Sequence, residues 1–213
     1  MGRHVPRSIA ALCVVIATGI AAPRVVVGAR SSVAAAQRQP AKELAAGKML
    51  VAARTMSDSL FADSVILLFS YSSDGAAGLV INKQSRVPVS RVLPDLPMPD
   101  GPAPILFLGG PVALTDVRAL VRSAQAPPDA RRLVKDVFLL TTAEAIDRET
   151  ETGAPMTRMR LYAGYAGWAP GQLEREILRG NWLIVDGDGD VVFDANPDTL
   201  WRREIKRADV AAA

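Results

Sequence analysis

The chain of 213 residues contains one histidine and one cysteine, and both lie near its start, at His4 and Cys13. The rest of the chain therefore lacks the groups of a Ser-His-Asp triad, of a Cys-His pair and of thiol redox chemistry. It also lacks the cysteine and histidine ligands of an ordinary zinc site, and it has no imidazole to act as a general base near neutral pH. Carboxylate, tyrosine, lysine or Ser-Lys chemistry remains open, although lysine is scarce.

Acidic residues are missing from the first part of the chain. Residues 1–36 contain four arginines and no aspartate or glutamate, whereas the whole chain has 25 basic and 22 acidic residues and a pI near 9.3. Without residues 1–36 the balance is 21 basic to 22 acidic residues, a formal net charge of −1. The basic pI therefore belongs to the leader, and it does not indicate a nucleic-acid-binding domain.

The leader has the layout of a secretory signal peptide. Residues 1–7 are basic, Ser8–Ala22 is an uncharged and mostly apolar run, and Pro23 ends it. The run is shorter than the ~20 residues that cross a bilayer comfortably. We expect an exported protein, or one anchored by an uncleaved signal, with membrane contact only through this segment. The alternatives are an organellar transit peptide and a mis-assigned start codon, and the latter would leave the protein in the cytoplasm.

The remaining sequence predicts one α+β domain. We expect a signal peptide or anchor (1–36), a linker (37–46), one folded domain (47–207) and a disordered tail (208–213). Short apolar or alternating runs predict strands at 49–53, 64–70, 78–82, 105–108, 117–122, 134–141, 159–163, 182–185 and 191–193. Capping and stop signals predict helices at 143–151, 170–179 and 196–207, and five prolines make 94–104 a loop. Strands and helices do not alternate, so we expect a single compact domain on a mixed, mostly antiparallel sheet with about three helices.

The most unusual segment is Gly164–Glu174, where three glycines separate a predicted strand from a predicted helix. Free backbone amides at the start of that helix could bind an anion or a peptide carboxylate. Alternatively, the glycines allow close packing and the tryptophan fills the core. Together with the Gly-Gly-Pro turn after residue 108, which could line the same groove, the candidate ligand-binding residues are Gly109, Gly110, Gly164, Tyr165, Gly167, Trp168, Gly171, Gln172 and Glu174.

Three further motifs are weaker. The run Asp186–Asp190 resembles a calcium loop, but Val191 and Pro197 stand where an EF-hand needs glycine and glutamate, so a hairpin between two strands is expected. The Gly109-Gly110-Pro111 turn lacks the remaining residues of a phosphate loop. The basic residues at 202–207 on the last helix are expected to form a solvated face.

Several ordered motifs together resemble the YqgE/AlgH family of bacterial proteins over about residues 47–207. They are Met56-x-Asp58-x-x-Phe61-x-x-Ser64-Val65, Asp74-Gly-Ala-x-Gly78-Leu-Val-Ile-Asn82, Gly109-Gly-Pro-Val112, Gly164-Tyr-Ala-Gly-Trp-x-Pro-Gly-Gln-Leu-Glu174-x-Glu176, Trp182-Leu183 and a late Asp-x-x-x-x-Trp ending on Trp201. The resemblance implies one compact α+β domain without a known cofactor. Some members are described as candidate transcriptional regulators, and no biochemical activity is established for the family.

The chain departs from the family pattern in places. The family usually has proline where Arg54 stands, Asp-Pro where Asp58-Ser59 stands, and histidines near Tyr71 and Arg122. Any role of those histidines does not carry over to this chain. The leader is also foreign to a family that is mostly cytoplasmic.

We therefore expect a non-enzymatic binding or regulatory domain without cofactor, metal site or catalytic residues. Its partner would be a small anionic or peptide ligand, or a protein, and nucleic acid is not expected. The alternatives are a transcriptional regulator and a hydrolase or transferase that uses the carboxylates Asp58 and Glu174 or a Ser-Lys pair.

Overall fold

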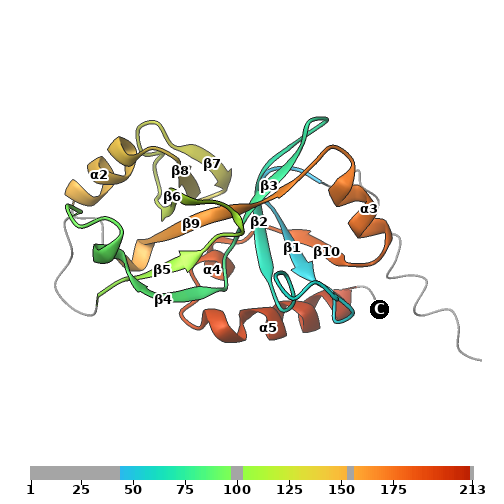
Figure 1. Ribbon diagram of the computed structural model, residues 1–213. Coiled ribbons are helices and arrows are strands. Elements are labelled where there is room, and N and C mark those ends of the chain that lie inside the picture. The colour runs from blue at the N-terminus through green and yellow to red at the C-terminus, as the bar shows by residue number, and fades with distance from the viewer. Residues whose placement is uncertain (1–43, 97–102, 153–155, 212–213) are drawn as a thin grey trace, which may run out of the picture. The chain divides into compact units, whose positions relative to one another are not determined.

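The computed structural model describes residues 44–96, 103–152 and 156–211 (Figure 1). The predicted leader, most of the predicted linker, part of the proline-rich loop and residues 212–213 lie outside these ranges. The strands are β1 (Lys48–Ala52), β2 (Val65–Ser72), β3 (Gly75–Val80), β4 (Gln84–Pro88), β5 (Ile105–Leu108), β6 (Val112–Arg122), β7 (Arg131–Val134), β8 (Val137–Leu140), β9 (Met159–Trp168) and β10 (Trp182–Asp186). The helices are α2 (Ala143–Glu151), α3 (Gln172–Leu178), α4 (Gly189–Val192) and α5 (Pro197–Ala211), with 3-10 turns η2 (Val89–Arg91) and η3 (Met156–Arg158).

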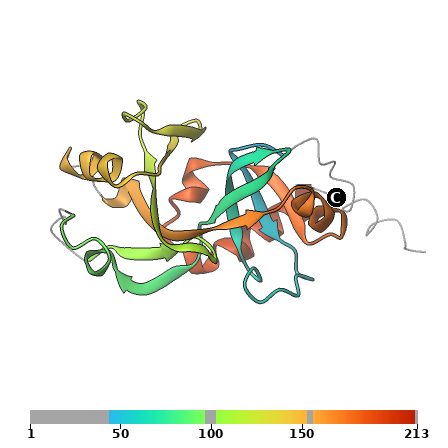
Figure 2. The same ribbon diagram turned by 45° about the horizontal axis from the view of Figure 1, so that its top comes forward.

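One sheet organises the described residues, in the order β10-β1-β2-β3-β9-β6-β8-β7, with β4 and β5 attached at β9. Every strand pair is antiparallel except β5 with β9. Strand β9 is central: its first half pairs with β6 and β5, and its last three residues pair with β3 (Figure 2, orange). The predicted α+β class with a mixed, mostly antiparallel sheet is confirmed.

The layers follow from the side-chain alternation of β2. Val65 and Leu67 lie in one apolar cluster and Ile66 and Leu68 in another, because successive strand residues point to opposite faces. Helix α5 supplies Leu200 and Ile205 to the first cluster, and α3 supplies Leu173 and Ile177 to the second. Both faces of β2 are thus covered, which explains its continuous apolar run.

Helix α2 closes a third apolar cluster. Its Ile146 packs with Val121, Leu140 and Leu161 of β6, β8 and β9. The helix begins where its capping signal predicts, at Ala143, and Thr142 is the N-cap, because its hydroxyl accepts from the Ala145 N–H at 3.2 Å. The described part of the chain contains no helix that is both long enough and apolar enough to span a membrane.

Four sequence expectations differ from the structure. The single strand predicted at 134–141 is the β7–β8 hairpin, which turns at Lys135-Asp136. The predicted strand 191–193 is wrong, and so is the hairpin before it: Asp188 accepts from the Asp190 N–H and caps the short helix α4. Strand β4 lies in a polar segment without a predicted element. Helix α5 begins at Pro197 as predicted but continues to Ala211, so 208–211 are helical rather than a disordered tail.

Candidate functional site

The glycine-rich segment is mostly strand. Strand β9 continues through Trp168, so Gly164–Trp168 do not form the turn expected between the strand and the helix. Helix α3 begins at Gln172 and is seven residues long, with Gly171 in the left-handed conformation at its N-cap (φ 70°). Gly164 and Gly167 therefore lie within β9, and Gly171 is the N-cap of α3.

Three of the candidate glycines lie where two backbones cross. A Cβ on Gly110 would lie 2.1 Å from the Tyr165 carbonyl carbon, and one on Gly164 would lie 2.5 Å from the Gly110 oxygen. A Cβ on Gly109 would lie 2.4 Å from the Gly164 oxygen. The Gly109 N–H also donates to the Ala163 oxygen at 2.8 Å. These glycines allow the β5–β6 connection to pass directly against β9, so the two segments are neighbours, but Gly109 and Gly110 line none of the described pockets.

Glu176, which is not among the predicted site residues, is the centre of a hydrogen-bond cluster. Its Oε2 accepts from the indole N–H groups of Trp168 (3.0 Å) and Trp182 (2.8 Å), and its Oε1 accepts from the Gln172 amide (2.9 Å). The two indoles meet edge to face, with ring centroids 6.1 Å apart, and Phe61 packs on both. The spacing of Glu176 from both tryptophans was visible in the sequence, but their convergence was not.

A second carboxylate of α3 binds the sheet. The Tyr71 hydroxyl of β2 donates to Glu174 Oε1 at 2.7 Å. This hydrogen bond to a carboxylate raises the pKa of Tyr71 above its ordinary value, so the phenol stays protonated. At the start of the helix, the Ala169 N–H donates to the Gln172 side-chain oxygen at 3.1 Å. Glu174 thus binds α3 to β2, and Gln172 binds the segment that leads into α3 and the Glu176 carboxylate, so both predicted ligand-binding residues already have protein partners.

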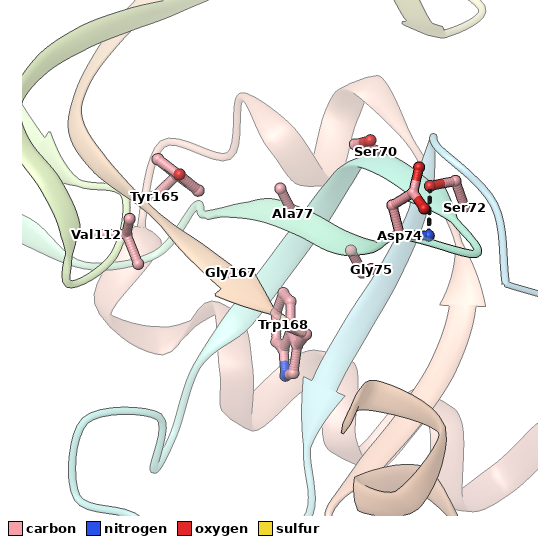
Figure 3. Close-up of a pocket in the computed structure, with 10 residues that line it drawn as sticks. Ser70, Ser72, Asp74, Gly75, Ala77, Val112, Tyr165, Gly167 and Trp168 are labelled. Carbon is pink, nitrogen blue, oxygen red and sulfur yellow. Dashed lines mark hydrogen bonds between the residues drawn. The ribbon is translucent and has the colours of Figure 1, made fainter. Parts of the chain in front are cut away.

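Three predicted residues of the segment, Tyr165, Gly167 and Trp168, line a pocket of about 370 Å³ between the β2–β3 hairpin, β9 and the start of β6 (Figure 3). We call it the hairpin pocket. Its lining residues are Ser70, Ser72, Asp74, Gly75, Ala76, Ala77, Val112, Tyr165, Gly167 and Trp168. The Asp74 N–H donates to the Ser72 hydroxyl at 3.1 Å, which fixes the tip of the hairpin beside the pocket (Figure 3). The pocket has one carboxylate and no cation in its lining.

Two features leave this pocket accessible. Residues 166–168 of β9 pair with β3 on one edge, while on the other edge β6 begins only at Val112, opposite Tyr165. Gly110 packs against Ala166 on that edge, and Gly167 is exposed with no described strand beside it. Beyond Val112, residues 113–116 of β6 bulge out of register with β9, and Ala113 has a positive φ of 48°. Val112 and Leu114 are 38% and 59% exposed.

The Arg118 guanidinium stacks on the ring of Tyr165. The Arg118 guanidinium carbon lies 4.5 Å from the centroid of the Tyr165 ring and 5.8 Å from that of Phe69. Phe69 and Tyr165 also meet edge to face, 6.0 Å apart. Such cation–π stacking restrains the tyrosine, and it places Arg118 outside the pocket lining.

The residues considered for catalysis do not meet in a described pocket. Asp58 binds the Leu60 N–H at 2.9 Å in a turn, and Glu174 binds Tyr71. Burial raises the pKa of Glu149 and Glu204, but neither lines the hairpin pocket or the other described pockets. Burial lowers the pKa of Lys83, which donates to the Leu60 carbonyl at 2.7 Å.

The described residues also contain no cluster of histidine, cysteine or carboxylate groups suited to hold a metal ion. In the Asp186–Asp190 run, Asp186 pairs with Lys48 (2.6 Å) and Asp190 with Arg122 (2.7 Å). The basic side chains of α5 are exposed, and Arg203 and Arg207 pair with Asp194 and Glu204.

Comparison with known proteins identifies the family. The AlgH-like family model, DUF179, matches residues 49–213. A UPF0301 protein of Ruegeria pomeroyi is 37% identical over 78% of this chain and 92% of its own length, and one of Methylococcus capsulatus is 34% identical over 76% and 90%. Among solved structures, protein DIP2367 of Corynebacterium diphtheriae matches with a TM-score of 0.67 and 28% identity, covering 80% of this chain and 93% of that one. The AlgH protein of Pseudomonas aeruginosa matches with a TM-score of 0.64 and 27% identity, covering 81% and 92%. As the resemblance indicated, the chain belongs to the AlgH-like family.

Proposed function

We propose that this domain is a non-enzymatic binding module that holds a peptide segment of a partner protein in the hairpin pocket. The observation that carries the proposal is the edge of β9 at Gly167, which is exposed, has no described strand on the side away from β3, and borders an open pocket and the exposed side chain of Val112. An extended peptide can add main-chain hydrogen bonds to such an edge and place alternate side chains into the adjoining pocket.

The chemistry of the lining favours a neutral or cationic peptide over a small anion. Asp74 contributes a carboxylate, Ser70 and Ser72 contribute hydroxyls, and Val112 contributes apolar surface. No lysine or arginine lines the pocket to neutralise a bound anion. The absence of a second carboxylate from the same lining also favours binding over the acid–base chemistry of a hydrolase.

A selection of displayed random peptides against the protein tests this function. Peptides that bind through an apolar side chain are expected to lose at least tenfold in affinity when Val112 is replaced by aspartate, because the apolar contact is lost and the carboxylate would have to be desolvated against that side chain. The matched control is Leu178→Asp, since Leu178 is 74% exposed on α3 and does not line the pocket. Fluorescence anisotropy with a labelled selected peptide gives the dissociation constants. A selection without binders, or binders equally weakened by both substitutions, would contradict the proposal.

We further propose that the protein is exported, or anchored by an uncleaved signal. The support is the basic start and the apolar run of Ser8–Ala22. N-terminal sequencing of the protein from fractionated cells should find it outside the cytoplasm, with a start after the apolar run or with the intact leader in the membrane fraction. Recovery of the protein mainly from the cytosol would refute this localisation.

A further inference from the structure

A second pocket, of about 670 Å³, lies at the other end of β9. Strands β6 and β9 run antiparallel with Val121 opposite Met159, so the residues after β6 and those before β9 meet there. Ser123 and Thr157 supply hydroxyls to the lining from these two segments. The Ser123 N–H donates to the backbone carbonyl of Asp136 at 2.9 Å, which fixes the β7–β8 turn at the same place. We call this site the basic pocket.

The charges of the basic pocket are predominantly positive. Arg122, Lys135 and Arg158 line it, together with one carboxylate, Asp136. Asp136 and, from outside this lining, Asp190 both bind Arg122, at 2.7 Å each. These bonds fix the Arg122 guanidinium in place. Within the described ranges, the charged groups of Lys135 and Arg158 have no ion pair, so two cations remain uncompensated.

An aromatic ring, Phe193, forms one wall of the basic pocket, and Arg160, which does not line the pocket, contacts this residue. Phe193 lines the pocket and is partly buried. Arg160 donates to the carbonyls on both sides of it, to Val192 at 2.7 Å and to Asp194. The Arg160 guanidinium also lies 5.7 Å from the centre of the Phe193 ring. The ring is therefore fixed before any ligand arrives, which reduces the entropy that binding would cost.

We propose that the basic pocket binds a small phosphate monoester that carries a flat ring, of which a nucleoside monophosphate is the simplest representative. Lys135 and Arg158 neutralise the phosphate, the hydroxyls of Ser123 and Thr157 donate to its oxygens, and the ring packs on Phe193. No lining residue is shared with the hairpin pocket, so this inference goes beyond the proposed function and adds a second, small-molecule site.

Isothermal titration of the protein with adenosine monophosphate, adenosine and inorganic phosphate tests the assignment. The monophosphate is expected to bind at least tenfold more tightly than either fragment. The double variant Lys135→Ala/Arg158→Ala should weaken its binding at least tenfold, and Phe193→Leu should reduce the advantage of the monophosphate over inorganic phosphate. The control, Arg86→Ala/Arg131→Ala, removes the same charge from two exposed positions outside the pocket. Circular dichroism confirms that each variant is folded.

Three results would overturn the proposal. The first is that the wild-type protein shows no saturable binding of the monophosphate. If the pocket variant and the control weaken binding of the monophosphate equally, the affinity depends on the overall charge of the protein and not on this pocket. Affinity for a single-stranded oligonucleotide that grows with its length and exceeds that for the monophosphate assigns the surface to nucleic acid instead.

Discussion

Replacing Gly110 by alanine is expected to destabilise the protein by about 3–5 kcal/mol, as measured by urea unfolding. Gly110 has a φ of 151°, which side-chain-bearing residues rarely adopt. A Cβ there would also lie 2.1–2.3 Å from the backbone atoms of Tyr165 and Ala166. Because these neighbours are backbone rather than flexible side chains, the β5–β6 connection must move away from β9.

Gly180→Ala is the matched control for this substitution. Gly180 also has a positive φ (77°), but a Cβ there meets nothing within 4 Å. It should cost about 1 kcal/mol, the conformational penalty alone. The difference between the two variants isolates the close approach of the two backbones. A Gly110→Ala protein that is as stable as Gly180→Ala would show that this crossing is loose enough to absorb a methyl group.

Replacing Glu176 by leucine is expected to destabilise the protein by about 3–4 kcal/mol. The substitution removes the acceptor of two indole N–H groups, on Trp168 and Trp182, whose side chains are only 5% and 2% exposed. A buried donor without a partner retains the full cost of its desolvation. Glu176→Gln should lose about half as much, because its carbonyl oxygen still accepts. Urea unfolding followed by tryptophan fluorescence measures both variants.

The same replacement at Glu151 provides the control, because Glu151 is exposed at the end of α2. It should change the free energy of unfolding by less than about 0.5 kcal/mol. If Glu176→Leu stays within about 1 kcal/mol of the wild type, the indoles have another acceptor. The carboxylate would then not be what holds α3 to the sheet.

Strand β9 connects the two proposed sites. Its last residues, Tyr165–Trp168, border the hairpin pocket, and the residues just before Met159 border the basic pocket. Each pocket draws its remaining residues from segments far apart in the sequence. Neither could therefore be assembled from motif spacing, and only three of the nine predicted ligand-binding residues line one of them.

The sequence predicted correctly those strands and helices whose pattern of apolar or capping residues lies within the element itself. The apolar run of β2 is buried on both faces, and α5 begins at Pro197, directly after Asn196, as expected. The prediction failed where distant residues decide the backbone. Gly164–Trp168 have the composition of a turn, yet they form strand because β3 pairs with them and Gly110 packs against them. Asp186–Asp190 likewise favoured a hairpin, but the Asp188 carboxylate caps a helix instead.

The amino-acid sequence by itself determined what chemistry is unavailable: beyond Cys13 there is no thiol and no imidazole, whatever the fold. It also determined the class of fold and the family, because apolar periodicity and ordered motifs are properties of the chain alone. Only the tertiary structure decided that Glu176 binds two indoles, that Gly109 and Gly110 serve a backbone crossing, and that Lys135 and Arg158 face one pocket. Those facts depend on which strands pair and in which register, and a single sequence does not specify contacts between segments that far apart.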